Sequence, residues 1–132
     1  MNVNCSLGDH NYLAEVKADD HLIKVDEPIK MGGADRHPNP IQYFLASLAS
    51  CTAITIKMYA QNKGWETGNI TVSVRMKDVL SEDKLYKKIT KTVQFEESLD
   101  NEQRKRLLSI GEKCPISKLL AHPVIIEIVS LE

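Results

Sequence analysis

The 132-residue chain is poor in aromatic residues, in cysteine and in net charge. Phe, Trp and Tyr make up 5% of it, cysteine occurs three times, and 17 basic residues stand against 18 acidic ones. Because nucleic acids and anionic membranes are bound through positive patches, this balance gives no reason to expect either as a partner. Three cysteines, an odd number, do not form the disulfide framework of a small secreted protein.

Long uninterrupted apolar runs are also missing. Polar residues such as Gln42, Ser50 and Lys57 interrupt the longest one, so the roughly 20 apolar residues that span a bilayer are not predicted. The first residues, MNVNCSLGDH, have neither the basic start nor the apolar stretch of a secretory signal. We therefore expect a cytoplasmic protein without a membrane partner. The length and the 42% hydrophobic content favour a single globular domain over residues 1–132.

The hydrophobic pattern predicts an α+β fold. The expected element order is β-β-α-β-β-α-α-β, with antiparallel hairpins and with helices segregated from the strands. Asp19 and Asp20 suit a turn between the first two strands, and the Gly- and Pro-rich stretch at residues 29–40 is predicted to be a loop that leads into the next helix. The expected strands are 12–18, 21–28, 69–79, 85–97 and 124–132, and the shorter helices are 100–114 and 115–121.

A long helix is expected in the middle of the chain. It should begin at Pro40 with Asn39 as its N-cap and end at Gly64, as Pro at the first position and Gly after the last are typical of helix ends. Its apolar side chains occupy more than one face, whereas each neighbouring sheet covers one. We therefore predict an obligate homodimer that buries the second face.

Two cysteines occupy positions that suit redox chemistry. Cys51 lies on the apolar stripe of the long helix, and Cys114 directly precedes Pro115 at the start of a later helix. Each has an ordinary interpretation, because a cysteine on an apolar face is usually a small hydrophobe and Cys114 could be a tolerated helix cap. Together they fit a peroxide-reducing pair, in which a second thiol captures the sulfenic acid of the first. Their spacing does not show whether they meet, and Cys5, near the N-terminus, is assigned no role.

Several motifs resemble a known family. The stretch DEPIKMGGADRHPNPIQYFLASLASCTAITIKMYAQNKGW, followed by EKCPISKLL and VIIEI, resembles the OsmC/Ohr family of organic hydroperoxide reductases from about residue 26 to the C-terminus. The resemblance implies an OsmC-like fold, with antiparallel sheets around long central helices in an intertwined homodimer. It implies that Cys51 is the peroxidatic thiol and Cys114 the resolving one. It further implies no bound cofactor, a small hydroperoxide as substrate, and an external dithiol or lipoyl-type reductant.

The chain departs from the family pattern around the peroxidatic thiol. Family members pair an arginine of an N-terminal strand with a carboxylate near the start of the long helix, and this pair holds the cysteine as thiolate. Here the carboxylate position falls at Ile41 or Gln42, and neither side chain ionises. The arginine position just before His21 holds Asp19 and Asp20, and a negative charge raises the pKa of a neighbouring thiol.

A substitute charge pair is available in the preceding loop. Arg36, together with Asp35 or Glu27, could supply the charges that the family pattern places elsewhere. We therefore include Arg36, Glu27 and Gln42 as supporting site residues. Arg36 as an ordinary solvated loop residue is the alternative.

A metal site is not expected. His37 and His122 accompany the cysteines, and histidine and cysteine are zinc ligands, but their spacing fits no known zinc pattern. The sequence thus leaves two functions open. The first is a thiol-dependent peroxidase, and the alternative is an OsmC-like dimer without efficient peroxidase activity that binds a small molecule.

Overall fold

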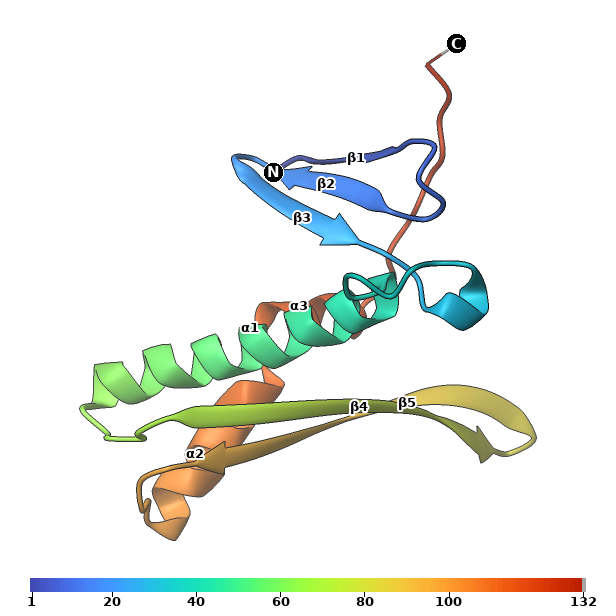
Figure 1. Cartoon of the computed structure of the whole chain (residues 1–132). Helices are drawn as coiled ribbons and strands as arrows, with labels where there is room; N and C mark the ends of the chain where they lie inside the picture. Colours follow the sequence, from blue (N-terminus) through green and yellow to red (C-terminus); the bar gives the residue numbers. More distant parts are fainter. Residues whose placement is uncertain (132) are drawn as a thin grey trace. The chain divides into compact units, whose positions relative to one another are not determined.

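The computed structural model describes residues 1–131 and has the predicted α+β architecture (Figure 1). The chain divides into two compact units, Met1–Leu45 and Ala46–Glu132, so that the long central helix begins in the first and continues in the second. A three-stranded antiparallel sheet belongs to the first unit and a two-stranded antiparallel hairpin to the second. The single domain expected over residues 1–132 stays a prediction.

The first unit contains the strands β1 (Val3–Leu7), β2 (Ala14–Ala18) and β3 (His21–Val25), which pair in that order. Asp19 and Asp20 form the predicted turn between β2 and β3, with Asp19 at a positive φ of 52°, a conformation that Asp tolerates better than most residues. Strand β1 was not predicted. Val3, Cys5 and Leu7 alternate with Asn4 and Ser6, but all five side chains are exposed, and main-chain pairing with β2 holds the strand in place.

The loop after β3 is organised around Asp26. This carboxylate is 2% exposed and accepts hydrogen bonds from the backbone N–H groups of Glu27, Ala34 and Arg36 at 2.8 to 3.4 Å. Between the first two of these donors the chain forms a short 3-10 helix, Ile29–Met31. The hydrogen bonds, led by the one from Glu27, lower the pKa of Asp26. The buried charge is thus compensated by the loop that it folds.

We expect Asp26→Ala to lower the melting temperature at neutral pH by about 5 °C or more, because three backbone donors lose their acceptor. A carboxylate with a depressed native pKa stabilises the fold above its unfolded pKa of about 3.9, and this contribution is lost as the pH falls through the native pKa. The difference from the wild type should therefore shrink in acid. Thermal melts at several pH values measure it, with Asp9→Ala, an exposed aspartate, as the control. An equal deficit at all pH values would contradict the electrostatic account.

The central helix α1 runs from Pro40 to Lys63, as predicted. Asn39 caps it, since its side chain accepts a hydrogen bond from the Gln42 N–H at 2.9 Å, and the Gln42 side chain accepts one from the Asn39 N–H at 2.8 Å. This reciprocal pair is a capping box. Gly64 follows the helix with a positive φ of 67°, the left-handed conformation common at helix ends.

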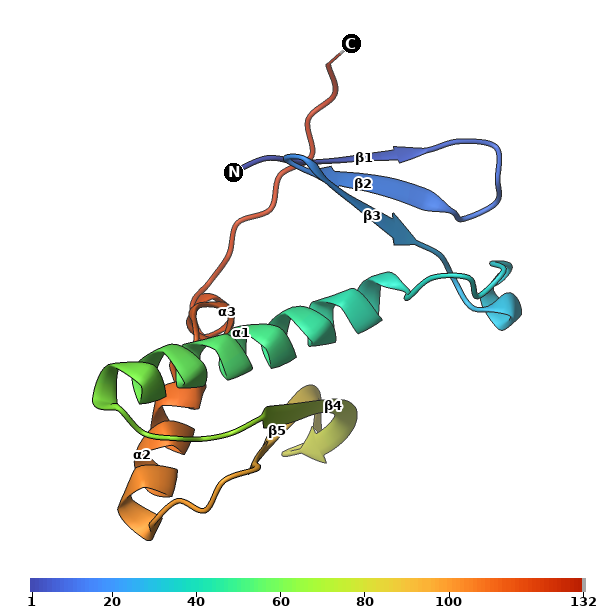
Figure 2. The same ribbon diagram turned by 60° about the vertical axis from the view of Figure 1, so that its left-hand side comes forward.

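The second unit contains the predicted hairpin of β4 (Ile70–Ser81) and β5 (Lys84–Phe95). The two-residue turn between the strands is Glu82–Asp83, and both residues have positive φ, 49° and 60°, as the type I′ turn requires. Alternate side chains of β4 from Ile70 to Met76 are half-buried, which confirms the predicted alternation. Figures 1 and 2 show this hairpin running alongside the part of α1 that belongs to the same unit.

Two helices follow the hairpin. α2 (Asn101–Glu112) has Asp100 as N-cap in a capping box with Gln103, and α3 (Pro115–Leu120) has Cys114 as N-cap and Pro at its first position. Both helices agree with the predicted ones. The core of this unit lies where α1, α2 and the hairpin meet. Its fully buried members are Ile56, Ala60 and Leu107, surrounded by the half-buried Tyr59, Trp65, Ile70, Val93, Phe95 and Leu99.

Close packing of α2 on α1 depends on Gly111. A Cβ atom at this position would stand 2.9 Å from Cδ1 of Ile56 and 3.2 Å from Cγ2 of Thr52. We expect Gly111→Val to lower the free energy of unfolding by about 2 to 3 kcal/mol, since the added methyl groups overpack a filled interface. Gly111→Ala is the matched comparison, because its better helix propensity offsets part of the crowding. Denaturant unfolding measures both, and a valine variant as stable as the wild type would contradict the packing.

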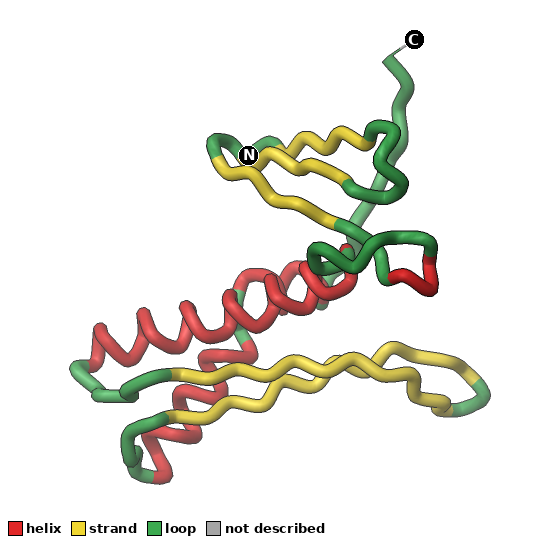
Figure 3. Tube along the Cα trace, in the orientation of Figure 1, coloured by secondary structure: helices red, strands yellow, loops and turns green. Residues whose placement is uncertain are grey.

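The prediction of a C-terminal strand at residues 124–132 is wrong for the residues of this segment that the structure describes. Residues 121–131 contain no strand, and Figure 3 draws them as an extended loop; Glu132 lies outside the described residues. The segment is nevertheless rich in exposed apolar side chains, among them Ile126 at 85% and Ile128 at 98% exposed. A strand needs a partner for its backbone groups, and the described part of this chain does not supply one here.

α1 is long and apolar enough, by length and composition, to cross a membrane, because an 18-residue window of it reaches a mean hydropathy of 1.2. The polar residues that interrupt it do not lower the average below that level. This is weak evidence for a span, since the core helix of a soluble protein passes the same test. In the second unit, α1 contributes Ile56 and Ala60 to the core.

Candidate functional site

The structure brings Cys51 and Cys114 together in the second unit. Cys51 lies on α1 and is half-buried, whereas Cys114 precedes α3 and is fully buried. Both are free thiols, and the Cys51 side chain lies close enough to Cys114 to contribute to lowering the pKa of its thiol. The fold of the second unit therefore places near each other two thiols that are far apart in the sequence. Cys5 is exposed on β1, in the other unit.

Polar groups surround the sulfur of Cys114. The Ser117 hydroxyl lies 3.0 Å from it, the Thr52 hydroxyl 3.6 Å and the Lys91 ammonium 4.0 Å. Burial raises the pKa of the Cys114 thiol, but hydrogen bonds from Ser117, Thr52 and Cys51 outweigh burial and lower that pKa to about 7. A large fraction of Cys114 is therefore thiolate at neutral pH, and the thiolate is the reactive form of cysteine.

Sequence reasoning missed Lys91, Ser117 and Thr52. The sequence held a usable signal for Lys91. Ile89 and Val93, two residues before and after it on the same face of β5, are apolar and half-buried. A lysine on the apolar face of a strand is unusual unless its charge has partners. Thr52 and Ser117 carry no comparable signal, since hydroxyl side chains are common on helices and in first turns.

The supporting residues expected around Cys51 lie in the first unit and have structural roles there. Gln42 completes the N-terminal capping box of α1, and the Arg36 backbone N–H binds the Asp26 carboxylate. The carbonyl of Glu27 accepts a hydrogen bond from the backbone N–H of Asp35. Within residues 1–131 the Arg36 side chain makes no ion pair with Glu27 or Asp35. Their proposed effect on Cys51 stays a prediction.

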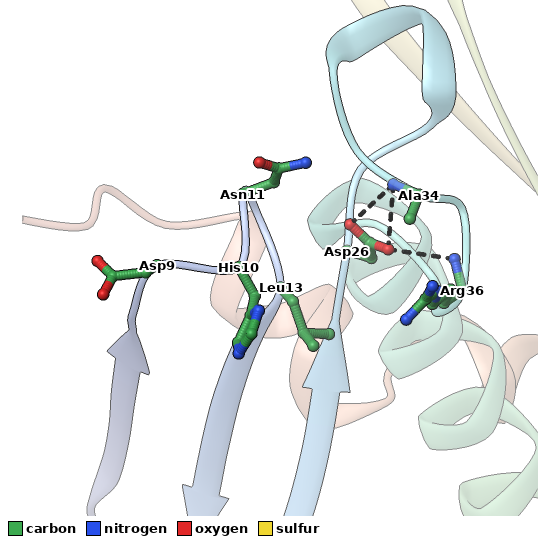
Figure 4. Close-up of a pocket in the computed structure, with 7 residues that line it drawn as sticks. All are labelled: Asp9, His10, Asn11, Leu13, Asp26, Ala34 and Arg36. Carbon is green, nitrogen blue, oxygen red and sulfur yellow. Dashed lines mark hydrogen bonds between the residues drawn. The ribbon is translucent and has the colours of Figure 1, made fainter.

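Arg36 lines a pocket of the first unit, of about 420 Å³. Figure 4 shows the pocket, with Asp26 held by the backbone of Ala34 and Arg36 on one side and His10 and Leu13 on the other. The Asp26 carboxylate is satisfied by three backbone donors. It is therefore a structural anchor of this loop.

Metal-ligating groups do not converge among the described residues. Within residues 1–131 no three His, Cys, Asp or Glu side chains gather in a way that could hold a metal ion. His37 lies close enough to Asp26 for its charge to contribute to lowering the pKa of that carboxyl. His122 follows α3, where its backbone N–H bonds to the carbonyl of Leu119.

Comparison with known proteins places this arrangement in a family. The family profile described as OsmC-like protein matches residues 32–129, which include both cysteines of the site. No curated protein is significantly similar to the chain.

Solved structures with the same fold include bacterial proteins of this kind. A protein of Psychrobacter arcticus named for osmotic stress induction and detoxification response is 18% identical, over 93% of this chain and 89% of that chain, with a TM-score of 0.73. The organic hydroperoxide resistance protein OsmC of Legionella pneumophila is 18% identical over 90% and 87%, with a TM-score of 0.66. The organic hydroperoxide resistance protein OhrB of Bacillus subtilis is 23% identical over 89% and 87%, with a TM-score of 0.60. At these identities the likeness establishes the fold.

Proposed function

Since the chain belongs to the family of OsmC-like proteins, we propose that it is a thiol-dependent peroxidase that reduces organic or small hydroperoxides through Cys51 and Cys114. The observation that carries the proposal is the proximity of the two free thiols, one of which has a pKa lowered to about 7. The names of the Legionella pneumophila and Bacillus subtilis structures, both organic hydroperoxide resistance proteins, support the substrate class.

The proposed reaction has two steps on the enzyme. The Cys51 thiolate attacks the distal oxygen of the hydroperoxide, so that an S–O bond forms, the O–O bond breaks and the alkoxide leaves and takes up a proton. Cys51 is now a sulfenic acid. The Cys114 thiolate then attacks the Cys51 sulfur, an S–S bond forms, and hydroxide leaves and takes up a proton to become water. Two electrons from an external dithiol, such as a lipoyl group, reduce the disulfide and complete the cycle.

The first experiment is to treat the reduced protein with one equivalent of cumene hydroperoxide and to measure intact mass and mapped peptides. We expect a Cys51–Cys114 disulfide to form rapidly and to be reversed by dihydrolipoamide. The Cys5→Ser variant is the control and should behave like the wild type. No oxidation, or slow sulfinic acid at Cys51 without a bridge, would reject the peroxidase.

A binding function is the second candidate, and one observation favours it. The charge pair that the family pattern places near the peroxidatic thiol is not formed by Arg36 with Glu27 or Asp35 among the described residues, and Gln42 acts as a helix cap. Without an activated Cys51, an OsmC-like dimer would bind a small molecule without turning over peroxide. Alkylation of Cys51 in a Cys5→Ser/Cys114→Ser variant distinguishes the peroxidase from the binding function. Alkylation that persists at mildly acidic pH requires an activated Cys51 thiolate.

We also propose that the protein acts as a homodimer in the reducing cytoplasm. In the single chain, α1 has one buried stripe, with Leu48, Ile56 and Ala60 on it, while Ile54 and Met58 are 58% and 64% exposed. Exposed apolar surface of this kind, with that of residues 124–131, is typical of an interface.

We expect Met58→Glu to convert the dimer to monomer, because burying an unpaired carboxylate in an apolar interface is strongly unfavourable. Light scattering coupled to gel filtration measures the mass. Glu66→Gln, at an exposed polar position after α1, is the control. A wild-type protein that is monomeric at micromolar concentration would contradict the proposal.

A further inference from the structure

Lys91 occupies a position where an apolar side chain is expected. It lies on β5 directly opposite Val74 of β4, and it is half-buried like Ile89 and Val93 on the same face. The neighbouring Lys88 lies on β5 as well but is exposed. A lysine whose ammonium group points toward the interior of a unit destabilises the fold unless that ammonium has hydrogen-bond acceptors.

The partners of the Lys91 ammonium come from three different helices. Its Nζ donates to the Thr52 hydroxyl of α1 at 3.1 Å, to the Gly111 carbonyl of α2 at 2.8 Å and to the Ser117 hydroxyl of α3 at 2.9 Å. An ammonium has three N–H donors, so these acceptors satisfy it completely. The sulfur of Cys114 lies 4.0 Å from the same nitrogen, close enough for a negative charge on sulfur to be stabilised.

Hydrogen-bond accounting at Ser117 indicates which way its proton points. Its oxygen accepts from Lys91 at 2.9 Å and lies 3.0 Å from the sulfur of Cys114. If Cys114 were a thiol that donated to Ser117, the serine proton would have no acceptor among residues 1–131. If Cys114 is a thiolate, the serine proton is donated to sulfur. A Cys114 thiol leaves the serine proton the same acceptor only when the thiol donates to the Thr52 oxygen at 3.6 Å, and the support for a stabilised negative charge on sulfur is then the Lys91 ammonium at 4.0 Å. Thr52 is less decisive, because its single proton is also close to the Leu48 carbonyl at 2.7 Å.

We propose that Lys91, acting on the sulfur directly and through Ser117, is the positioning residue that keeps Cys114 as a thiolate ready to attack oxidised Cys51. The inference rests on the proposed function and names the group that prepares its second step. Lys91 does not itself form or break a bond. In that step the Cys114 thiolate forms the S–S bond, the S–O bond of the Cys51 sulfenic acid breaks, and the hydroxide that leaves takes a proton from solvent.

Other charged groups near Cys114 do not account for the same effect. Lys113 and Glu112 are its neighbours in sequence, and both are exposed. The groups that face the sulfur from α1 are Thr52 and Cys51. Both side chains are neutral when they donate a hydrogen bond. Within residues 1–131, the cation in contact with the sulfur is Lys91.

The first test titrates Cys114 alone. In a Cys5→Ser/Cys51→Ser background, ultraviolet thiolate absorbance is followed against pH for Lys91→Met, Lys91→Arg and Ser117→Ala. We expect Lys91→Met and Ser117→Ala each to raise the Cys114 pKa by about one unit or more, and Lys91→Arg, which keeps the positive charge, to preserve most of the shift. Lys88→Met is the matched control and should leave the titration unchanged.

The second test measures the step itself. In the Cys5→Ser background, rapid mixing with one equivalent of cumene hydroperoxide separates sulfenic acid formation on Cys51 from disulfide formation. We expect Lys91→Met to leave the first unchanged and to slow the second about tenfold at neutral pH, with the pH profile of the second displaced upward.

The outcomes distinguish this inference from the proposed function. A wild type that does not react with hydroperoxide rejects the peroxidase, yet the titration still decides the role of Lys91. Unchanged titrations of both Lys91→Met and Ser117→Ala would overturn the inference. If Lys91→Met does not fold, Ser117→Ala carries the test alone, because it removes a single oxygen and leaves the lysine in place.

Discussion

Replacing Cys51 by serine should reduce hydroperoxide turnover by about 10⁴-fold or more, the loss typical of removing a catalytic nucleophile. The serine hydroxyl is far less ionised and less nucleophilic toward peroxide oxygen than a thiolate. Cys51 is the half-buried member of the pair, whereas Cys114 is fully buried, so peroxide is expected to reach Cys51 first. A coupled assay with cumene hydroperoxide and dihydrolipoamide measures turnover.

The matched variants sharpen this result. Cys114→Ser should rapidly consume about one equivalent of peroxide on Cys51, because the sulfenic acid that forms has no resolving thiol. A second equivalent then oxidises it slowly to sulfinic acid, and consumption stops. Cys5→Ser, which changes an exposed thiol in the other unit, should retain full activity. Turnover that survives Cys51→Ser but not Cys114→Ser would reverse the two roles and make Cys114 the nucleophile.

The parts of the fold that obey local rules could be predicted from the sequence. The ends of α1 follow from Asn39, Pro40 and Gly64, and the β4–β5 hairpin follows from alternation and a charged turn. Strand β1 was missed although its sequence VNCSL alternates apolar and polar residues; with only five residues the signal is short, and the strand is held by pairing with β2. Residues 124–131 have a strand-like sequence but no pairing partner within the described chain, so composition alone misleads there.

The two cysteines of the candidate site could be proposed from the sequence, whereas the residues that surround them could not. Both cysteines can be picked out in the sequence, but their proximity depends on tertiary packing, to which the close approach of α2 to α1 at Gly111 belongs. Lys91 gave a readable signal, a cation on an apolar strand face, whereas its bonds to three helices depend on tertiary structure. For the supporting residues, the structure shows a loop bond from the Arg36 backbone and a capping role for Gln42, and their proposed effect on Cys51 stays a prediction.

The reduced protein should become more stable relative to Cys114→Ser as the pH rises from 7 to 9. Hydrogen bonds to the buried sulfur lower the Cys114 pKa from its ordinary value of 9.0 to about 7. A group whose native pKa is depressed contributes its full stabilisation above the unfolded pKa and loses it as the pH falls through the native pKa. Over this window the difference in unfolding free energy should therefore grow by about 2 kcal/mol.

Denaturant unfolding in the presence of a phosphine reductant measures this difference, because the reductant keeps both thiols from forming a disulfide. Cys5→Ser is the control and should track the wild type at every pH, since its thiol is exposed. Lys91→Met should lose most of the pH-dependent increment, because the thiolate would no longer have its cation and its oriented serine. A stability difference between the wild type and Cys114→Ser that stays constant from pH 7 to 9 would mean that Cys114 titrates alike in the folded and unfolded chain. The site would then lack the preformed thiolate on which fast resolution depends.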